Sequence, residues 1–255
     1  MVARSHGLIS ALAVVAFVAL WHWASTTLID PFFLPAPPKI LAGAVELARR
    51  GTLLPAVGAS LARVFTGWLL GSLIAIPVGL VVGTSRVAKS IVDPFLHFFR
   101  FIPAIALITL FMVWFGVGEL SRILLIIYAT GFIVMINTAT GVGAVEEEKL
   151  YAARSLGATG WQTFIHVTIP AAVPYIYVGM RLAMASSFLV IIAAEMLAAH
   201  TGLGNLIWTS RLFFRIDWMF AGIVLLGLLG FLTDRLWRTV GNRLLGRYVR
   251  EVGRY

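Results

Sequence analysis

Long stretches without a charged residue constrain the fold of this chain more than any other feature of its sequence. Residues 5–29, 64–85 and 123–145 contain no Asp, Glu, Lys or Arg. About 20 apolar residues carry a helix across the hydrocarbon core of a membrane, so each of these runs is long enough to form a span. Shorter charge-free runs follow at 51–62, 101–118, 182–194 and 218–233.

The composition agrees with an integral membrane protein and disfavours two other classes. The 255 residues are 60% hydrophobic and 12% charged, with a mean hydropathy of +0.95. Soluble domains carry about 25% charged residues, so an unusually apolar soluble α-protein is disfavoured. The runs do not alternate between polar and apolar residues, which disfavours a membrane β-barrel. Cysteine is absent, which excludes a disulfide framework, a thiolate metal site and a cysteine nucleophile.

We therefore predict an all-α integral membrane protein with about six transmembrane helices. The first run resembles a signal peptide, but it is too long, ends in Trp21, His22 and Trp23, and lacks a cleavage site. It is better interpreted as an uncleaved span. The predicted spans are 8–29, 58–83, 101–118, 121–143, 172–198 and 218–240.

The distribution of Lys and Arg predicts the orientation of these spans. With the N-terminus in the cytoplasm, 13 of the 20 basic residues fall inside and 7 outside. This bias predicts that both termini are cytoplasmic. The chain then divides into residues 1–57, with the first span and an external amphipathic segment, a helical core at 58–245, and a basic cytoplasmic tail at 246–255.

Four glycines in the second predicted span recur at a spacing of four residues. They form the pairs Gly67 with Gly71 and Gly79 with Gly83. Small residues at this spacing allow two helix backbones to approach closely. We interpret them as a helix-packing surface.

The sequence offers no catalytic or metal-binding constellation. The stretch GTSRVAKS at 83–90 lacks the glycine before the lysine of a P-loop and follows a membrane helix rather than a strand. The histidines are scattered, with no pair at metal-binding spacing. The acidic run at 146–148 is interpreted as the start of a solvated helix. We therefore expect no catalytic residue, no metal site and no directly bound cofactor.

Glu195 interrupts the apolar run LVIIAAEMLAA, where an ionisable group costs several kcal/mol unless it faces a cavity or a partner. It either lines a translocation path or gate, or pairs with an arginine or a backbone group. Asn137 in the fourth span is a weaker candidate for the path, with hydrogen bonding between helices as the alternative. Arg181 could assist an anion, neutralise a neighbouring group, or extend its charged end to the membrane interface.

Residues 144–171 form the longest predicted cytoplasmic loop between spans. EEEKLYAARSLG predicts a short helix that is acidic at its start and ends at Gly157. GWQTFIHVTI predicts a second short helix, and Pro170 marks the entry to the next span. The second helix is more apolar than a solvated linker requires, so the pair is expected to dock into a groove on another protein.

The spacing Y-A-A-x3-G-x9-V-x-I-P in this loop resembles the EAA loop of the membrane subunits of bacterial ABC importers. The family pattern is E-A-A-x3-G-x9-I-x-L-P; Ala152, Ala153, Gly157 and Pro170 match it, whereas Tyr151 replaces the glutamate. Over about residues 30–245, stretches such as LPAPPKIL and AAEMLAAHTGLGNLIW resemble the branch that serves nitrate, bicarbonate, taurine and aliphatic sulfonates.

This resemblance implies a type I ABC importer permease (MetI-like) fold in the bacterial cytoplasmic membrane. Two permease copies, or this chain and a related permease, would form the path. Two cytoplasmic ATPase subunits would bind ATP and Mg, and an extracytoplasmic binding protein would deliver a small anionic solute. No nucleic acid is expected as a partner; membrane lipid surrounds the spans. The expected ATPase-coupling residues are Tyr151, Ala152, Ala153, Arg154, Gly157 and Pro170.

Three other functions compete with the importer. A secondary transporter driven by an ion gradient would need paired intramembrane charges and internal repeats, and only Glu195 is evident. A membrane enzyme would need a clustered catalytic set. A structural anchor would explain neither the loop pattern nor Glu195.

Overall fold

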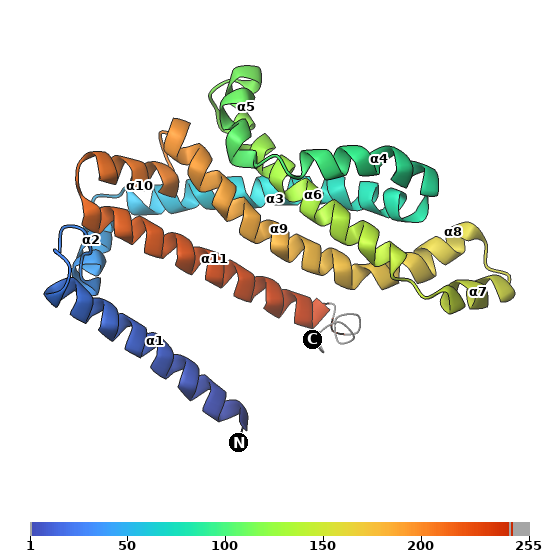
Figure 1. Ribbon diagram of the computed structural model, residues 1–255, viewed down its shortest axis with the longest axis horizontal. Coiled ribbons are helices and arrows are strands. Elements are labelled where there is room, and N and C mark those ends of the chain that lie inside the picture. Colours follow the sequence, from blue (N-terminus) through green and yellow to red (C-terminus); the bar gives the residue numbers. More distant parts are fainter. Residues whose placement is uncertain (1, 245, 247–255) are drawn as a thin grey trace.

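The computed structural model describes residues 2–244 and 246, and every regular element within them is helical, so the predicted all-α fold is confirmed. The predicted basic tail, 246–255, lies outside the described residues except for residue 246. Figure 1 shows the long helices as a tilted bundle. The helices are α1 (Val2–Thr27), α2 (Pro37–Arg49), α3 (Leu53–Thr84), α4 (Arg86–Phe99), α5 (Ile108–Phe115), α6 (Glu119–Gly143), α7 (Glu147–Ser155), α8 (Gly160–Thr163), α9 (Ile169–Ala198), α10 (Leu203–Leu212) and α11 (Ile216–Leu244), with a 3-10 turn η1 (Ala104–Leu107) before α5 and a π-helical turn η2 (Phe164–Thr168) before α9.

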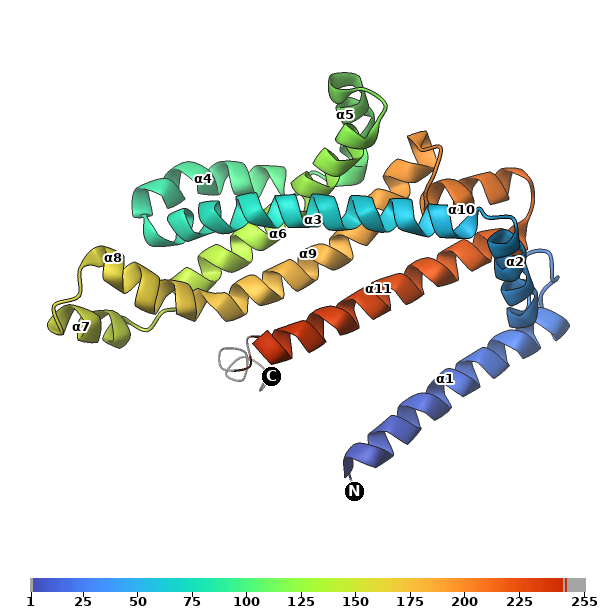
Figure 2. The ribbon, with the colours of Figure 1, turned by 180° about the vertical axis from the view of Figure 1, so that it is seen from behind.

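The bundle has two distinct ends. One end carries α7 and α8, and we call it the α7 end; the other carries α2 and α10, and we call it the α10 end (Figures 1 and 2). Among the described residues, five helices are long and apolar enough to span a membrane. They are Leu8–Thr27, Leu53–Thr84, Glu119–Gly143, Gly160–Leu197 and Ile216–Arg243.

The glycine stripe of α3 packs against α6, as predicted. A Cβ added at Gly67 would lie 2.6 Å from Ile126 Cβ, and one added at Gly79 would lie 2.7 Å from Thr138 Cβ. Both partners advance by twelve positions between these contacts, so α3 and α6 run in the same direction. The stripe therefore brings two parallel backbones together at a distance that a larger side chain would prevent.

A continuous third span over 101–118 is wrong. Within that range only Ala104–Phe115 is helical, and it is bent by 82° from Arg86–Phe99, the helix that precedes it. Pro103 lacks an amide hydrogen and disfavours helical geometry at the residue before it, so the helix stops and restarts there. Because α3 and α6 are parallel, the bent pair must return the chain toward the α10 end, as a single broken span would.

The stripe predicts a large difference between two glycine substitutions. Gly79→Leu should destabilise the protein by about 1–3 kcal/mol, because the new side chain meets the backbone oxygen of Met135 at 2.8 Å as well as Thr138. Gly131→Leu on α6 is the matched control, since none of the residues that the structure describes lies within 4 Å of an added Cβ there. Thermal unfolding of the purified variants measures both; equal losses would contradict the packing argument.

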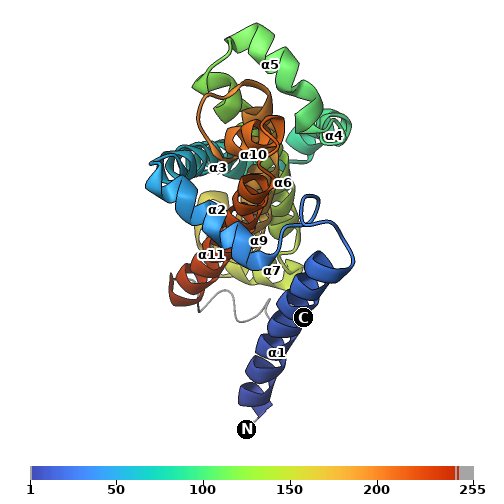
Figure 3. The same cartoon turned by 90° about the vertical axis from the view of Figure 1, so that its left-hand side faces the viewer.

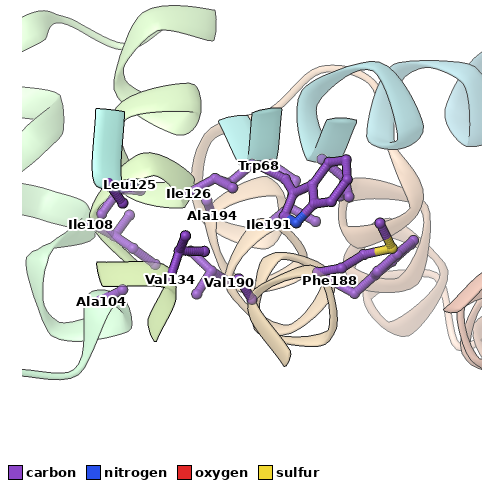
Figure 4. Close-up of a cluster of buried hydrophobic side chains, with 14 residues drawn as sticks. Trp68, Ala104, Ile108, Leu125, Ile126, Val134, Phe188, Val190, Ile191 and Ala194 are labelled. Atoms are coloured by element: carbon purple, nitrogen blue, oxygen red, sulfur yellow. The ribbon is translucent and has the colours of Figure 1, made fainter. Parts of the chain in front are cut away.

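The core lies where α3, α6 and α9 meet. Figure 4 shows Trp68 of α3, Val134 of α6 and Ile191 of α9 within one cluster of buried side chains. The indole of Trp68 donates a 2.8 Å hydrogen bond to the carbonyl of Met180, which ties α3 to α9. The three helices therefore form one packed unit.

At the α10 end, α2 is fastened to the start of α11 by charged groups. Arg215 and Arg50 donate 2.6 Å bonds to the two carboxylate oxygens of Glu46. The hydrogen bond from Arg215 holds the pKa of Glu46 below its ordinary value, so this carboxylate stays charged at neutral pH. The Arg215 guanidinium also lies 3.7 Å from the centre of the Trp218 ring. The amphipathic segment predicted before the second span is therefore a helix held against the bundle.

Helix α1 diverges from the bundle. Only 6% of its apolar segment is buried, against 39% for α3. Figure 3 shows α1 extending away from the other long helices beyond its connection to α2. Its apolar surface is thus left for lipid or for another chain to cover.

Candidate functional site

The loop between α6 and α9 forms a helical hairpin at the α7 end. Helix α7 begins with Glu147 and Glu148 and has Arg154 in its last turn, so its charges oppose the helix dipole favourably at both ends. Gly157 has a φ of 78°, a left-handed conformation that glycine adopts without steric cost. The expected first helix and its glycine turn are confirmed.

The second helix of the hairpin begins at a capping box that sequence reasoning missed. The Thr159 amide donates to Gln162 Oε1 at 2.8 Å, and Thr159 Oγ1 accepts from the Gln162 amide at 3.3 Å. The signal was present in the sequence as a threonine followed three residues later by glutamine. It sets the helix start at Gly160.

The sequence predicts that this second helix ends before the span, and that prediction is wrong. It continues through η2 into α9, and Gly160–Leu197 forms one helical segment of 38 residues. Pro170 lies in the first turn of α9, directly after the π-helical turn, rather than at a break. The hairpin is therefore joined to the membrane span without a flexible joint.

Large apolar side chains project from the hairpin. Tyr151 is 58% exposed, Leu156 88% and Trp161 69%. The Trp161 ring stacks on Phe164, with ring centres 5.6 Å apart. Exposure of large apolar side chains to water is unfavourable, and a partner that covers them removes this cost. This end of the molecule therefore has the character of a contact surface.

The predicted coupling residues fall into two groups. Tyr151, Ala152, Arg154 and Gly157 are exposed on the hairpin, and Ala153 is half-buried. The Arg154 guanidinium lies 6.0 Å from the centre of the Tyr151 ring. Pro170, in the first turn of α9, is also half-buried and does not belong to the exposed surface.

Glu195 lies in a buried network near the α10 end. Its side chain is fully buried, and its Oε1 accepts a 2.7 Å bond from Arg63 on α3. Ser60 donates to both carboxylate oxygens at 2.9 and 2.8 Å, and the Gly204 amide donates to Oε2 at 2.9 Å. In this conformation Glu195 therefore pairs with an arginine and with backbone, rather than facing an open cavity. A role in the translocation path stays a prediction.

Arg63 extends this network to α6 and to the loop before α10. It donates from Nε and Nη2 to Glu119 at 2.6 and 2.7 Å, and from Nη1 to the Thr201 carbonyl at 2.7 Å. From the sequence, Arg63 counts only as one of the seven basic residues assigned to the outside. The available signal was a lone arginine in one apolar span and a lone glutamate in another.

Asn137 lies between α6 and α9. Its Nδ2 donates to the Ile133 carbonyl of its own helix at 2.8 Å. A Cβ added at Gly179 of α9 would lie 2.6 Å from Asn137 Cβ, so the two helices touch closely here. The hydrogen bond is thus within α6 rather than between helices, and a place in the path remains a prediction.

Arg181 pairs with Asp234 of α11. Its Nε donates a 2.5 Å bond to Oδ1, and Arg238 donates to Oδ2 of the same carboxylate at 2.6 Å. Of the three interpretations of Arg181, the structure supports neutralisation of a neighbouring group.

Comparisons with known proteins agree with this architecture. Residues 53–246 match the model of the family described as binding-protein-dependent transport system inner membrane component. A probable ABC transporter permease protein of Brucella melitensis is 37% identical over 89% of this chain and 92% of its own length. The taurine transport system permease protein of Escherichia coli is 34% identical over 92% of this chain and 87% of its own.

Solved structures share the fold. A chain of the MetNI methionine ABC transporter in an inward-facing conformation superposes with a TM-score of 0.67. The superposition covers 81% of this chain and 99% of the other, at 22% sequence identity. The sequence matches and this fold together show that the chain belongs to the family of binding-protein-dependent transport system inner membrane components, the membrane-spanning permeases of ABC importers.

Proposed function

We propose that this permease moves a small anionic solute by alternating access, driven by ATPase subunits that grip the hairpin at the α7 end. The observation that supports this most directly is the continuous segment from Gly160 to Leu197. A force applied to the exposed apolar surface of Tyr151, Leu156 and Trp161 would pass into a membrane span with no joint to absorb it.

The proposed assembly contains two permeases, two ATPase subunits and an extracytoplasmic binding protein. ATP and Mg would be held by the ATPase subunits, and this chain would bind no cofactor of its own. The divergence of α1, with little of its apolar segment buried, leaves a surface that a second permease copy or lipid can cover. The family match supports partners of these kinds.

The proposed orientation places the α7 end in the cytoplasm of a bacterial inner membrane. Both termini then lie on the cytoplasmic side, in agreement with the excess of basic residues assigned there. The α10 end, with α2 fastened to α11 through Glu46 and Arg215, would face the binding protein.

The proposed solute belongs to the group that includes nitrate, bicarbonate, sulfonates and taurine. The relative from Escherichia coli is named for taurine, which is an aminosulfonate. A transporter driven by an ion gradient is the alternative, and the family match does not favour it.

Uptake by reconstituted proteoliposomes tests this function. Vesicles that contain the permease, its ATPase and its binding protein should accumulate labelled taurine or a related anion only when ATP is supplied to the ATPase side. Vesicles with the permease alone, under an imposed proton or sodium gradient, are the control. Accumulation in the control vesicles without ATP would reject the importer mechanism.

A further inference from the structure

A cavity of about 500 Å³ lies between α4 and α6, near the α7 end. Four side chains of α4 line it: the buried Leu96 and three ionisable groups at a spacing of four residues, Lys89, Asp93 and His97. Ile136 and Thr140 of α6 line the opposite side. Figure 2 shows α4 beside the C-terminal half of α3, at the same end of the bundle as α7 and α8.

Helix α4 presents opposite chemistry on its two faces. Val87, Ile91, Phe95 and Phe98 are each more than 60% exposed and point away from the cavity lining. The helix is one half of the bent pair that passes as a span. An apolar exterior suits lipid, whereas ionisable groups within a span face a bundle interior or a water-filled cavity and mark solute pathways.

The three ionisable side chains are open to solvent and have no polar partner in the described part of the chain: Lys89 and His97 are exposed and Asp93 is half-buried. In the part of the chain that the structure describes, none of them forms an ion pair or a side-chain hydrogen bond. Lys89 and Asp93 are one turn apart, but the lysine precedes the carboxylate, which is the weaker order for a pair within a helix. Arg63 and Arg181, by contrast, are each engaged by a carboxylate.

We infer that this cavity is a binding site for a small zwitterion, a solute that carries one anionic and one cationic group. Neighbouring side chains one helical turn apart lie about 5–6 Å apart at Cβ, so a positive and a negative group flank the ligand within its own length. Asp93 would attract the ammonium and Lys89 the anionic group. A simple anion would gain from Lys89 but would be repelled by Asp93. His97 offers a further donor on the far side of Asp93.

This inference deepens the proposed function, on which it rests, because it selects aminosulfonates from the wider group of small anions. It is tested by equilibrium binding, which does not require the ATPase. The full-length chain in phosphatidylglycerol nanodiscs would be titrated with taurine, with ethanesulfonate, which lacks the amine, and with ethylamine, which lacks the sulfonate. Taurine should bind more tightly than either half-molecule.

Two variants and a matched control assign the contacts. Asp93→Asn should lose about five- to tenfold in taurine affinity, as expected for one partly exposed ion pair. The same variant should not weaken ethanesulfonate binding, because it removes a charge that repels this anion. Lys89→Gln should weaken both sulfonates. Arg86→Gln removes a cation from the same helix outside the cavity lining and should change neither affinity.

The outcomes separate this site from the transport function. An unchanged ratio of taurine to ethanesulfonate affinity in Asp93→Asn overturns the site, even if ATP-driven uptake is demonstrated. Absence of taurine binding to the wild-type chain does so as well. A phosphoethanolamine headgroup carries the same two charges, so the titration is repeated with phosphatidylethanolamine in the nanodiscs. Competitive displacement of taurine by this lipid would assign the cavity to a headgroup and reject the solute site.

Discussion

Arg63→Met is expected to lower the free energy of unfolding by about 3–5 kcal/mol. The substitution leaves the carboxylate of Glu195, which has no exposed side-chain surface, without its 2.7 Å cationic partner. Ser60 and the Gly204 amide still donate to Glu195, but neither carries a charge. Denaturant unfolding of the purified permease in detergent measures the loss.

The double variant Arg63→Met with Glu195→Met separates a buried charge from general disruption. Replacing both members of a buried ion pair by apolar groups costs less than removing one, so the double variant should be more stable than Arg63→Met alone. Arg50→Met is the matched surface control, because its pair with Glu46 is half-exposed, and it should cost about 1 kcal/mol or less. Additive losses in the double variant would contradict this account.

Gly157→Trp is expected to reduce recovery of the ATPase subunit with the purified permease by about tenfold or more, with a matching loss of uptake. Nothing in the described part of the chain lies within 4 Å of a Cβ added at Gly157, so the tryptophan meets no obstacle there. It would project from the turn of the hairpin into the groove of the partner. Co-purification of the two subunits is the measurement.

Two controls remove the effect of backbone strain from this comparison. Gly157→Asn adds a small side chain that tolerates the left-handed φ of 78°, and it should retain the ATPase. Gly51→Trp places the same bulk at a φ of 70°, also in open space, at the α10 end. It pays a similar backbone cost far from the hairpin and should leave co-purification intact. Equal losses at positions 51 and 157 would argue against contact through the hairpin.

The long spans could be predicted from the sequence because hydrophobic length is a local property. The break before Pro103 was missed for the same reason: residues 101–118 are uniformly apolar, and length alone favoured one straight helix. The proline competes with that signal through backbone geometry rather than hydropathy. The continuity of α8 with α9 was missed because Pro170 was interpreted as a boundary, although a first-turn proline is compatible with a helix.

The candidate sites also divide into those with a local sequence signal and those that depend on the packing of distant helices. The hairpin could be predicted because its charges, its glycine and its apolar residues are contiguous. The partner of Glu195 could not, because Arg63 lies 132 positions away and only the packing of α3 against α9 brings them together. The set of Lys89, Asp93 and His97 was overlooked because, in the sequence alone, each looks like an ordinary solvated side chain. Their shared position at the cavity becomes evident only when the structure shows that the apolar face of α4 points outward.

The number of residues in the π-helical turn η2 determines the direction in which the hairpin points from α9. In this turn the Ile169 amide donates to Phe164, five residues back, so it holds one residue more than an ordinary α-helical turn. Each residue of an α-helix advances the chain by about 100° around the axis. Deleting one residue from η2 would therefore swing Trp161 and the α7 surface by roughly a quarter of a revolution about α9 while leaving their composition unchanged. The direction in which the contact surface faces thus depends on the position of this one-residue insertion. A relative with the same surface residues but no such insertion would carry them on a different side of the α9 axis.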